Sequence, residues 1–315
     1  MTPLSRTPRL LLVLSENWTM TSPRDLRALV RIAAEAEQAG IDGVMLSEHI
    51  VLGPAAGAAG VMANPREYAV PGNQPPDMPW PSSVVLLSAI AATTDRLRLI
   101  AGAIIAPLRH PLLLAKELGT LDLLSEGRLV VIPTVSWHPD EYAALGVPFH
   151  QRGALLDEQL DVLARCWRPG PVSYHGKHYS FDEVWLAPGP FRPDGPPLWF
   201  GGQRMHPALL RRLVRWGSGF NPLGAPSAAD LAALGDGLRA AGRDLAELEL
   251  VGGIRGRFPG PDAPADLDEA LRDLPGQLAA GFGTICFKPS MYLDDARDIG
   301  PFCRRLVRRV EEIAS

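Results

Sequence analysis

The sequence predicts a (β/α)8 TIM barrel formed as a single domain over residues 1–315, with insertions at about 52–81 and 168–197. Short apolar runs alternate along the chain with longer segments of helical period, the order expected of parallel strands covered by helices. The chain holds eight such units, and barrels of about 250 residues with insertions commonly form one domain. No G-x-G-x-x-G motif follows the first strand, which disfavours the competing doubly wound dinucleotide-binding fold.

The first half of the chain contains four strand candidates. Residues 10–14 are a continuous apolar run, as a strand covered on both faces requires. Ser22 caps the helix that follows, Pro23 occupies its first position, and Gly40 ends it. The next three strands are predicted at residues 43–47, 97–105 and 128–132, with helices starting at Ser82 or Ser83 and at Pro111.

The second half repeats the same unit. A helix at residues 153–167 is followed by a hairpin at residues 172–186. The remaining strands are predicted at residues 198–200, 219–222, 248–254 and 284–288, and the helices at residues 207–216, 228–241, 266–280 and 295–313. This order completes eight strands, each followed by a helix.

The composition argues against several partners. The net charge is −4, from 31 Lys and Arg against 35 Asp and Glu, so no basic field favours nucleic acid or an anionic membrane. No apolar run approaches the ~20 residues that span a bilayer. The 3 cysteines, an odd number without metal-ligand spacing, predict reduced thiols and a cytoplasmic protein. No H-x-H, H-E-x-x-H or carboxylate cluster is present, so we expect no metal site.

Functional residues of a barrel lie at the C-terminal ends of its strands. His49 follows the second predicted strand, and an imidazole can donate or accept a proton near neutral pH. A histidine in this place can equally be a structural residue. The other polar strand ends are Arg109-His110, Thr134 to His138, Gly201-Gly202-Gln203 and Asn221.

These residues and their order resemble the bacterial luciferase-like superfamily, and within it the compact group of oxidoreductases that depend on coenzyme F420. The resemblance extends from the first strand to about Gly224. It is carried by GIDGVMLSEH at residues 40–49, residues 91–99, PLRHPLLLAKEL at residues 107–118, residues 121–128, ALGVPF at residues 144–149, Arg152-Gly153 and LWFGG at residues 198–202.

The resemblance implies a flavin or deazaflavin ring across the mouth of the barrel. It places a bulge with a cis peptide at about Gly102-Ala103, against one face of the ring. It places the phosphate-bearing tail near glycines that let backbone amides approach an anion. The residues expected at this tail are Gly201, Gly202, Gln203 and Asn221.

Further site residues follow from the same resemblance. Glu48 and His49 match the acid-His pair of the family, with Glu48 expected to hold the tautomer of a catalytic His49. Relatives have a glycine-rich run after strand four, where this chain has Thr134 and Ser136, so these hydroxyls are expected to contact the cofactor or narrow its pocket. The expected walls of the substrate pocket are Trp18, Trp80 and Trp137.

Three hypotheses about function remain open. The first is hydride transfer between F420 and a small organic substrate, with His49 moving the accompanying proton. The second is an FMN-dependent monooxygenase that uses reduced flavin, supplied by a flavin reductase, and O2. The third is a barrel that binds such a cofactor or another ligand without catalysis. The resemblance also implies a homodimer, and the sequence does not identify the substrate.

Overall fold

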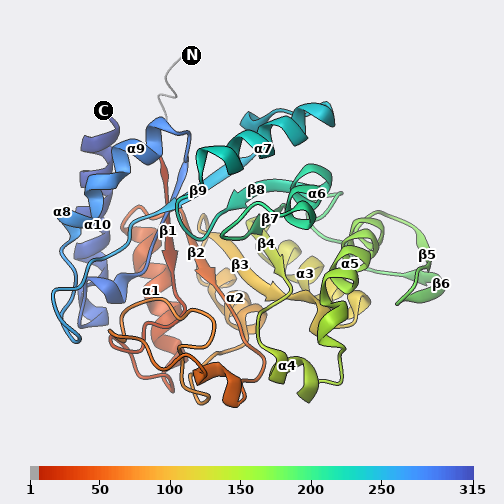
Figure 1. Ribbon diagram of the computed structural model, residues 1–315, viewed down its shortest axis with the longest axis horizontal. Helices are drawn as coiled ribbons and strands as arrows, with labels where there is room; N and C mark the ends of the chain where they lie inside the picture. Colours follow the sequence, from red (N-terminus) through yellow and green to blue (C-terminus); the bar gives the residue numbers. More distant parts are fainter. Residues whose placement is uncertain (1–6) are drawn as a thin grey trace.

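The computed structural model describes residues 7–315 and confirms the (β/α)8 barrel (Figure 1). Parallel strands close in the order β1-β10-β9-β8-β7-β4-β3-β2. These strands are β1 (Arg9–Val13), β2 (Gly43–Leu46), β3 (Arg98–Ile105), β4 (Leu129–Thr134), β7 (Leu198–Gly201), β8 (Gly217–Asn221), β9 (Glu249–Gly253) and β10 (Thr284–Phe287). The predicted hairpin also forms, from β5 (Pro171–His175) and β6 (Ser180–Trp185), and lies outside the barrel.

Helices surround the barrel (Figure 1). They are α1 (Leu26–Gln38), α2 (Ser83–Ala91), α3 (Pro111–Leu124), α4 (Pro139–Ala144), α5 (Arg152–Cys166), α6 (Pro207–Trp216), α7 (Ala228–Ala240), α8 (Leu267–Ala270), α9 (Leu274–Ala279) and α10 (Ile299–Ala314). The single helix predicted at residues 266–280 is wrong. A 3-10 turn at Leu271–Asp273 separates α8 from α9, and Pro275 has no N–H with which to continue an α-helix across that point.

Alternation along the strands separates two apolar clusters. In β1, Leu10 and Leu12 face the helices, whereas Leu11 and Val13 face the barrel interior. Both sets are buried, which explains why the strand reads as one apolar run. The interior is filled by Leu11, Val13, Met45, Ile100, Val130, Ile132, Trp199, Val251 and Cys286.

A network of charges closes the N-terminal end of the barrel. The Glu249 carboxylate accepts hydrogen bonds from the Arg98 guanidinium at 2.7 and 3.0 Å and from the Thr284 hydroxyl. Burial alone would raise the pKa of Glu249, but these donors and Arg9 hold it below its ordinary value. Because this end lies opposite the strand ends that carry function in such barrels, we assign these residues to stability.

The long connection between β2 and α2, residues 47–82, crosses the C-terminal end of the barrel, and we call it the mouth loop. It is tied on one side to α4 and on the other to the segment after β10. Two residues after Arg66, Tyr68 packs against the interior apolar cluster. The mouth loop therefore covers part of the barrel opening, as Figure 1 shows beside α4.

No helix among residues 7–315 has both the length and the apolar character needed to cross a membrane. Within the same residues, no group of three or more His, Cys, Asp or Glu side chains is placed to hold a metal ion. Cys166, Cys286 and Cys303 are free and buried, and burial raises the pKa of Cys286 to about 12. These thiols are therefore packing groups rather than nucleophiles.

Candidate active site at the barrel mouth

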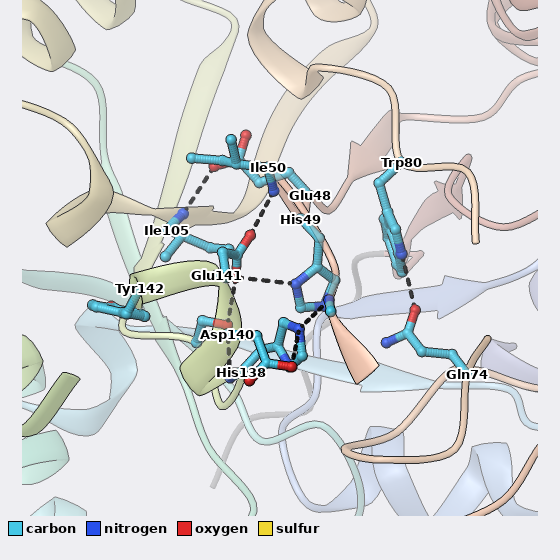
Figure 2. Close-up of polar contacts among 12 residues, drawn as sticks. Glu48, His49, Ile50, Gln74, Trp80, Ile105, His138, Asp140, Glu141 and Tyr142 are labelled. Carbon is cyan, nitrogen blue, oxygen red and sulfur yellow. Dashed lines mark hydrogen bonds and ion pairs between the residues drawn. The ribbon is translucent and has the colours of Figure 1, made fainter. Parts of the chain in front are cut away.

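Glu48, directly after β2, is bound to the framework of the barrel. Its carboxylate accepts from Arg109 at 2.6 and 2.9 Å, from the Ser83 hydroxyl at 3.0 Å and from the Ile105 amide at 3.0 Å. The side chain is 2% exposed. The expectation that Glu48 holds the tautomer of His49 is wrong, because its oxygens accept from these donors, of which Figure 2 shows Ile105.

The carboxylate beside His49 belongs to Glu141, in α4. His49 Nδ1 lies 3.3 Å from Glu141 Oε2, and the Ile50 amide donates to Glu141 Oε1 at 2.5 Å (Figure 2). The Ser136 hydroxyl donates to the same Oε2 at 3.2 Å. A carboxylate beside Nδ1 favours the proton on that nitrogen, which leaves Nε2 as the acceptor. Nε2 has no hydrogen-bond partner within residues 7–315.

Local sequence explains why Glu141 reaches this position. After β4 the chain turns at Ser136, whose φ of 57° lies in the left-handed region. Pro139 then starts α4, and Asp140 and Glu141 occupy its first turn, where carboxylates are favoured by the helix dipole. This helix was not predicted from the sequence, although a proline followed by two acids is a signal for a helix start.

The tryptophans expected around the substrate divide into two groups. Trp80 and Trp137 lie edge-on to the His49 ring, with ring centroids 5.1 and 5.6 Å from it. The Trp80 indole N–H donates to Gln74 at 2.9 Å, which fixes that ring within the mouth loop. Trp18 donates to the carbonyl of Pro79 at 3.2 Å and so supports the loop from the end of β1.

A second buried group of charges, which was not predicted from the sequence, follows β1 and β10. Glu16 accepts from the Ala69 amide at 2.9 Å, and Lys288 donates to the Glu67 carbonyl at 2.6 Å. Burial raises the pKa of Glu16, against the opposing effects of Lys288 and His49, and burial lowers the pKa of Lys288. The Lys288 ammonium also lies 5.3 Å from the centre of the Tyr68 ring. Glu16 and Lys288 therefore lie at the same end of the barrel as His49.

The predicted cis peptide is present between Gly102 and Ala103, where the register of β3 shifts against β4. A Cβ on Gly102 would lie 2.8 Å from Ile132 Cδ1, so packing in the interior requires glycine there. Ala103 is half-buried and packs against the interior cluster. Thr134, at the end of β4, is half-buried and pairs in register with Ile105.

The expected tail-binding residues lie together at the ends of β7 and β8. The Gly202 amide donates to the Asn221 carbonyl at 3.3 Å, and Asn221 Oδ1 accepts from the Leu223 amide at 3.3 Å. A Cβ on Gly201 would lie 2.8 Å from the Asn221 carbonyl oxygen, so close strand packing explains this glycine. Gln203 is exposed.

The sequence model of the luciferase-like monooxygenase family matches residues 8–256, which is most of the chain. This chain belongs to the luciferase-like monooxygenase family. Members of this family are oxidoreductases and monooxygenases.

Two curated relatives match part of this luciferase-like chain. An uncharacterized protein of Mycobacterium tuberculosis is 38% identical over 121 residues, covering 38% of this chain and 41% of that protein. The FMNH2-dependent dimethylsulfone monooxygenase of Pseudomonas putida is 32% identical over 138 residues, covering 42% of this chain and 38% of that protein. The matches thus span about two fifths of the length of these relatives.

Solved structures share the complete fold of this luciferase-like protein. A monooxygenase from Streptomyces bottropensis has a TM-score of 0.71 at 21% identity, with 96% of this chain and 99% of that chain covered. The coenzyme F420-dependent tetrahydromethanopterin reductase of Methanopyrus kandleri has a TM-score of 0.67 at 14% identity, with the same coverage of 96% and 99%. At these identities the similarity establishes the fold alone.

Proposed function

We propose that this protein is a coenzyme F420-dependent oxidoreductase that transfers hydride to or from a small organic substrate at the barrel mouth. The observation that carries the proposal is the pairing of His49 with the buried Glu141 beside the Gly102-Ala103 bulge. This combines a group able to move a proton with a stretch of small side chains in the neighbouring strand β3. The choice of cofactor follows the resemblance of the sequence to the F420-dependent group, and a solved F420-dependent reductase shares the fold.

The residues at the mouth fit a planar ring with an anionic tail. Side chains are small near the ends of two strands, at Gly102-Ala103, which only two more residues of β3 follow, and at Gly252-Gly253, which end β9. A flat group laid across these positions would meet backbone and a methyl group rather than bulky side chains. Arg204 and Arg255 are exposed at the ends of β7 and β9. Their guanidinium groups would attract a phosphate-bearing tail. In this arrangement the Ser136 hydroxyl donates to Glu141, and the Thr134 hydroxyl would meet the ring.

A bound deazaflavin supplies a ring carbon that accepts or donates hydride. The residues of this chain would then supply the proton and exclude water. His49 exchanges a proton with the substrate at Nε2, while Glu141 holds Nδ1. The mouth loop would cover the reacting atoms, with its Tyr68 and Trp80 displacing solvent together with Trp137 from the turn after β4. Glu48 stabilises this strand end through Arg109.

An FMN-dependent monooxygenase is the second candidate. The relative that favours it is the FMNH2-dependent dimethylsulfone monooxygenase, which is 32% identical over 138 residues. In that case the protein requires reduced flavin from a flavin reductase. Glu48 does not discriminate between the two cofactors, because its carboxylate is bound to Arg109.

Binding experiments with both cofactors test the proposal. Oxidised and reduced F420 and FMN are titrated into the protein, and the Kd is measured by calorimetry and by tryptophan fluorescence. Tighter binding of F420 supports the proposal, tighter binding of FMN selects the monooxygenase, and binding of neither cofactor overturns both. Binding without turnover of any substrate in a broad panel supports a ligand-binding barrel without catalysis.

A matched pair of variants tests the position of the cofactor. Ala103→Leu places a larger side chain on the β3 bulge, and we expect at least a tenfold rise in Kd. Ala92→Leu makes the same change at an exposed residue beyond the end of α2 and should leave the Kd unchanged. Equal Kd values for the two variants would show that the ring does not lie against β3.

A further inference from the structure

His138 makes a contact that the proposed reaction does not use. It lies between β4 and α4, its side chain is fully buried, and its Nε2 accepts a hydrogen bond from the Gly53 amide at 2.8 Å (Figure 2). Gly53 belongs to the mouth loop and immediately precedes its short 3-10 turn, Pro54–Gly57. This contact therefore holds the start of the mouth loop against α4.

The direction of this hydrogen bond determines the protonation state of the ring. Because Nε2 accepts, it carries no proton, and a neutral ring has its proton on Nδ1. Nδ1 is buried and has no partner within residues 7–315. A proton added to Nε2 would face the N–H of Gly53 and would remove the hydrogen bond. The contact therefore exists only while His138 is neutral.

The surrounding groups decide whether protonation is favourable. Burial lowers the pKa of His138, and His49 lowers it further, while Asp140 and Glu141 oppose the shift. Asp140 Oδ2 lies 4.0 Å from Nε2, but the same oxygen already accepts from the Ala55 amide at 2.9 Å. From the mouth loop, the Gly53 amide faces Nε2 and the His49 ring lies edge-on to His138, with ring centroids 6.2 Å apart. The neutral imidazole of His138 is therefore the form that accepts the hydrogen bond from Gly53.

Gly53 packs so closely against Asp140 that losing its hydrogen bond to His138 would displace the mouth loop. A Cβ on Gly53 would lie 2.5 Å from Asp140 Oδ2 and 2.6 Å from Asp140 Cβ. The loop start is therefore pressed against α4 without spare space, four residues beyond His49. Any reorientation of the loop here is transmitted to the backbone that carries His49 and Ile50, both held by Glu141.

We propose that His138 is a positioning residue that, when neutral, docks the mouth loop at Gly53 onto the start of α4, four residues beyond His49, and that releases the loop when it is protonated. Its role in catalysis rests on the proposed function, whereas the docking itself does not. The undocked imidazole has an ordinary pKa of about 6.5, and the docked one a lower pKa. Docking is therefore complete above about pH 6.5 and weakens as the pH falls below that value.

Hydrogen exchange of the protein without cofactor or substrate tests this proposal. Exchange of the peptide covering residues 50–58 is measured at pH 7.5 and 5.5, after correction for the intrinsic exchange rate. We expect roughly tenfold lower protection at pH 5.5, the effect of losing one hydrogen bond of ordinary net strength. The segment held by Arg66, residues 64–68, has no histidine contact and serves as the internal control.

Two variants complete the test. His138→Gln retains an acceptor of similar reach that does not titrate, so protection of residues 50–58 should be high at both pH values. Gly53→Ala should give low protection at both, because the added methyl group meets Asp140. Unchanged protection of the wild-type peptide, or an equal loss in His138→Gln, would overturn the proposal. Since no cofactor is present, neither result depends on the proposed function.

Discussion

Glu141 Oε2 lies 3.3 Å from Nδ1 of His49, although 92 positions separate the two residues in the chain. The same carboxylate accepts from the Ile50 amide and the Ser136 hydroxyl. One buried side chain of α4 thus joins the end of β2 to the turn after β4. This contact orients the residue that we propose as the proton-transfer group.

Removing the Glu141 carboxylate should destabilise the protein and disorder His49. Glu141→Ala leaves three donors without their acceptor, and we expect a loss of about 3 kcal/mol in the free energy of unfolding. Asp140→Ala, in the same turn of α4, removes the acceptor of one amide and should cost about 1 kcal/mol. Urea denaturation measures both. Equal losses would mean that Glu141 is not the central contact.

The pair formed by Glu48 and Arg109 is expected to be strongly coupled. Its carboxylate is buried and accepts from both terminal nitrogens of the guanidinium. A double-mutant cycle with Glu48→Ala and Arg109→Ala should give a coupling energy of at least about 2 kcal/mol. The more exposed pair Arg215 and Asp161 is the control and should show little coupling. Similar coupling in the two pairs would contradict the structural role of Glu48.

The barrel could be predicted because strand burial and helix capping are local signals. The apolar run at residues 10–14 and the helix start at Pro111 can each be recognised from residues that are consecutive in the sequence. The place of the bulge at Gly102-Ala103 was also predicted, but through a resemblance to a family. The division of the helix at residues 266–280 was missed, because Pro275 is compatible with the first turn of a second helix.

The partners within the site could not be predicted in the same way. Glu141 meets His49 because the barrel places β2 and β4 on either side of β3, a relation in space that no sequence period reports. Tyr68 lies in a loop without period, so its packing into the barrel mouth depends on the loop's tertiary contacts. Glu48 was assigned to His49 because they are adjacent in sequence, but the structure turns its side chain toward Arg109.

Packing inside the barrel leads to a prediction about Gly219. A Cβ at this position would lie 2.3 Å from Cδ1 of Trp199, which is 1% exposed. Gly219→Ala should therefore lower the free energy of unfolding by about 1–3 kcal/mol. Gly224→Ala has no atom within 4 Å of the added methyl group and should have little effect. Thermal unfolding of the two variants would disprove the packing argument if Gly219→Ala were as stable as the wild type.

The buried carboxylate of Glu16 predicts a pH dependence of stability. Burial raises its pKa in the folded chain, so the folded state binds a proton more readily than the unfolded state does. Stability from this group is present below the unfolded pKa of about 4.3 and is lost as the pH rises through the folded pKa. Glu16→Gln removes this loss, so its stability relative to wild type should improve between pH 4 and pH 7.5.

Glu37 gives the opposite sign and therefore the control for Glu16. Burial would raise the pKa of Glu37. Its carboxylate accepts hydrogen bonds from the amides of Asp95, Arg96 and Leu97, and these bonds hold the pKa below its ordinary value. Its contribution is present above the unfolded pKa and is lost on acidification. Glu37→Gln should thus be more destabilising at pH 7.5 than at pH 4 in urea unfolding. If both variants changed in the same direction with pH, the ionisation assigned to Glu16 would be wrong.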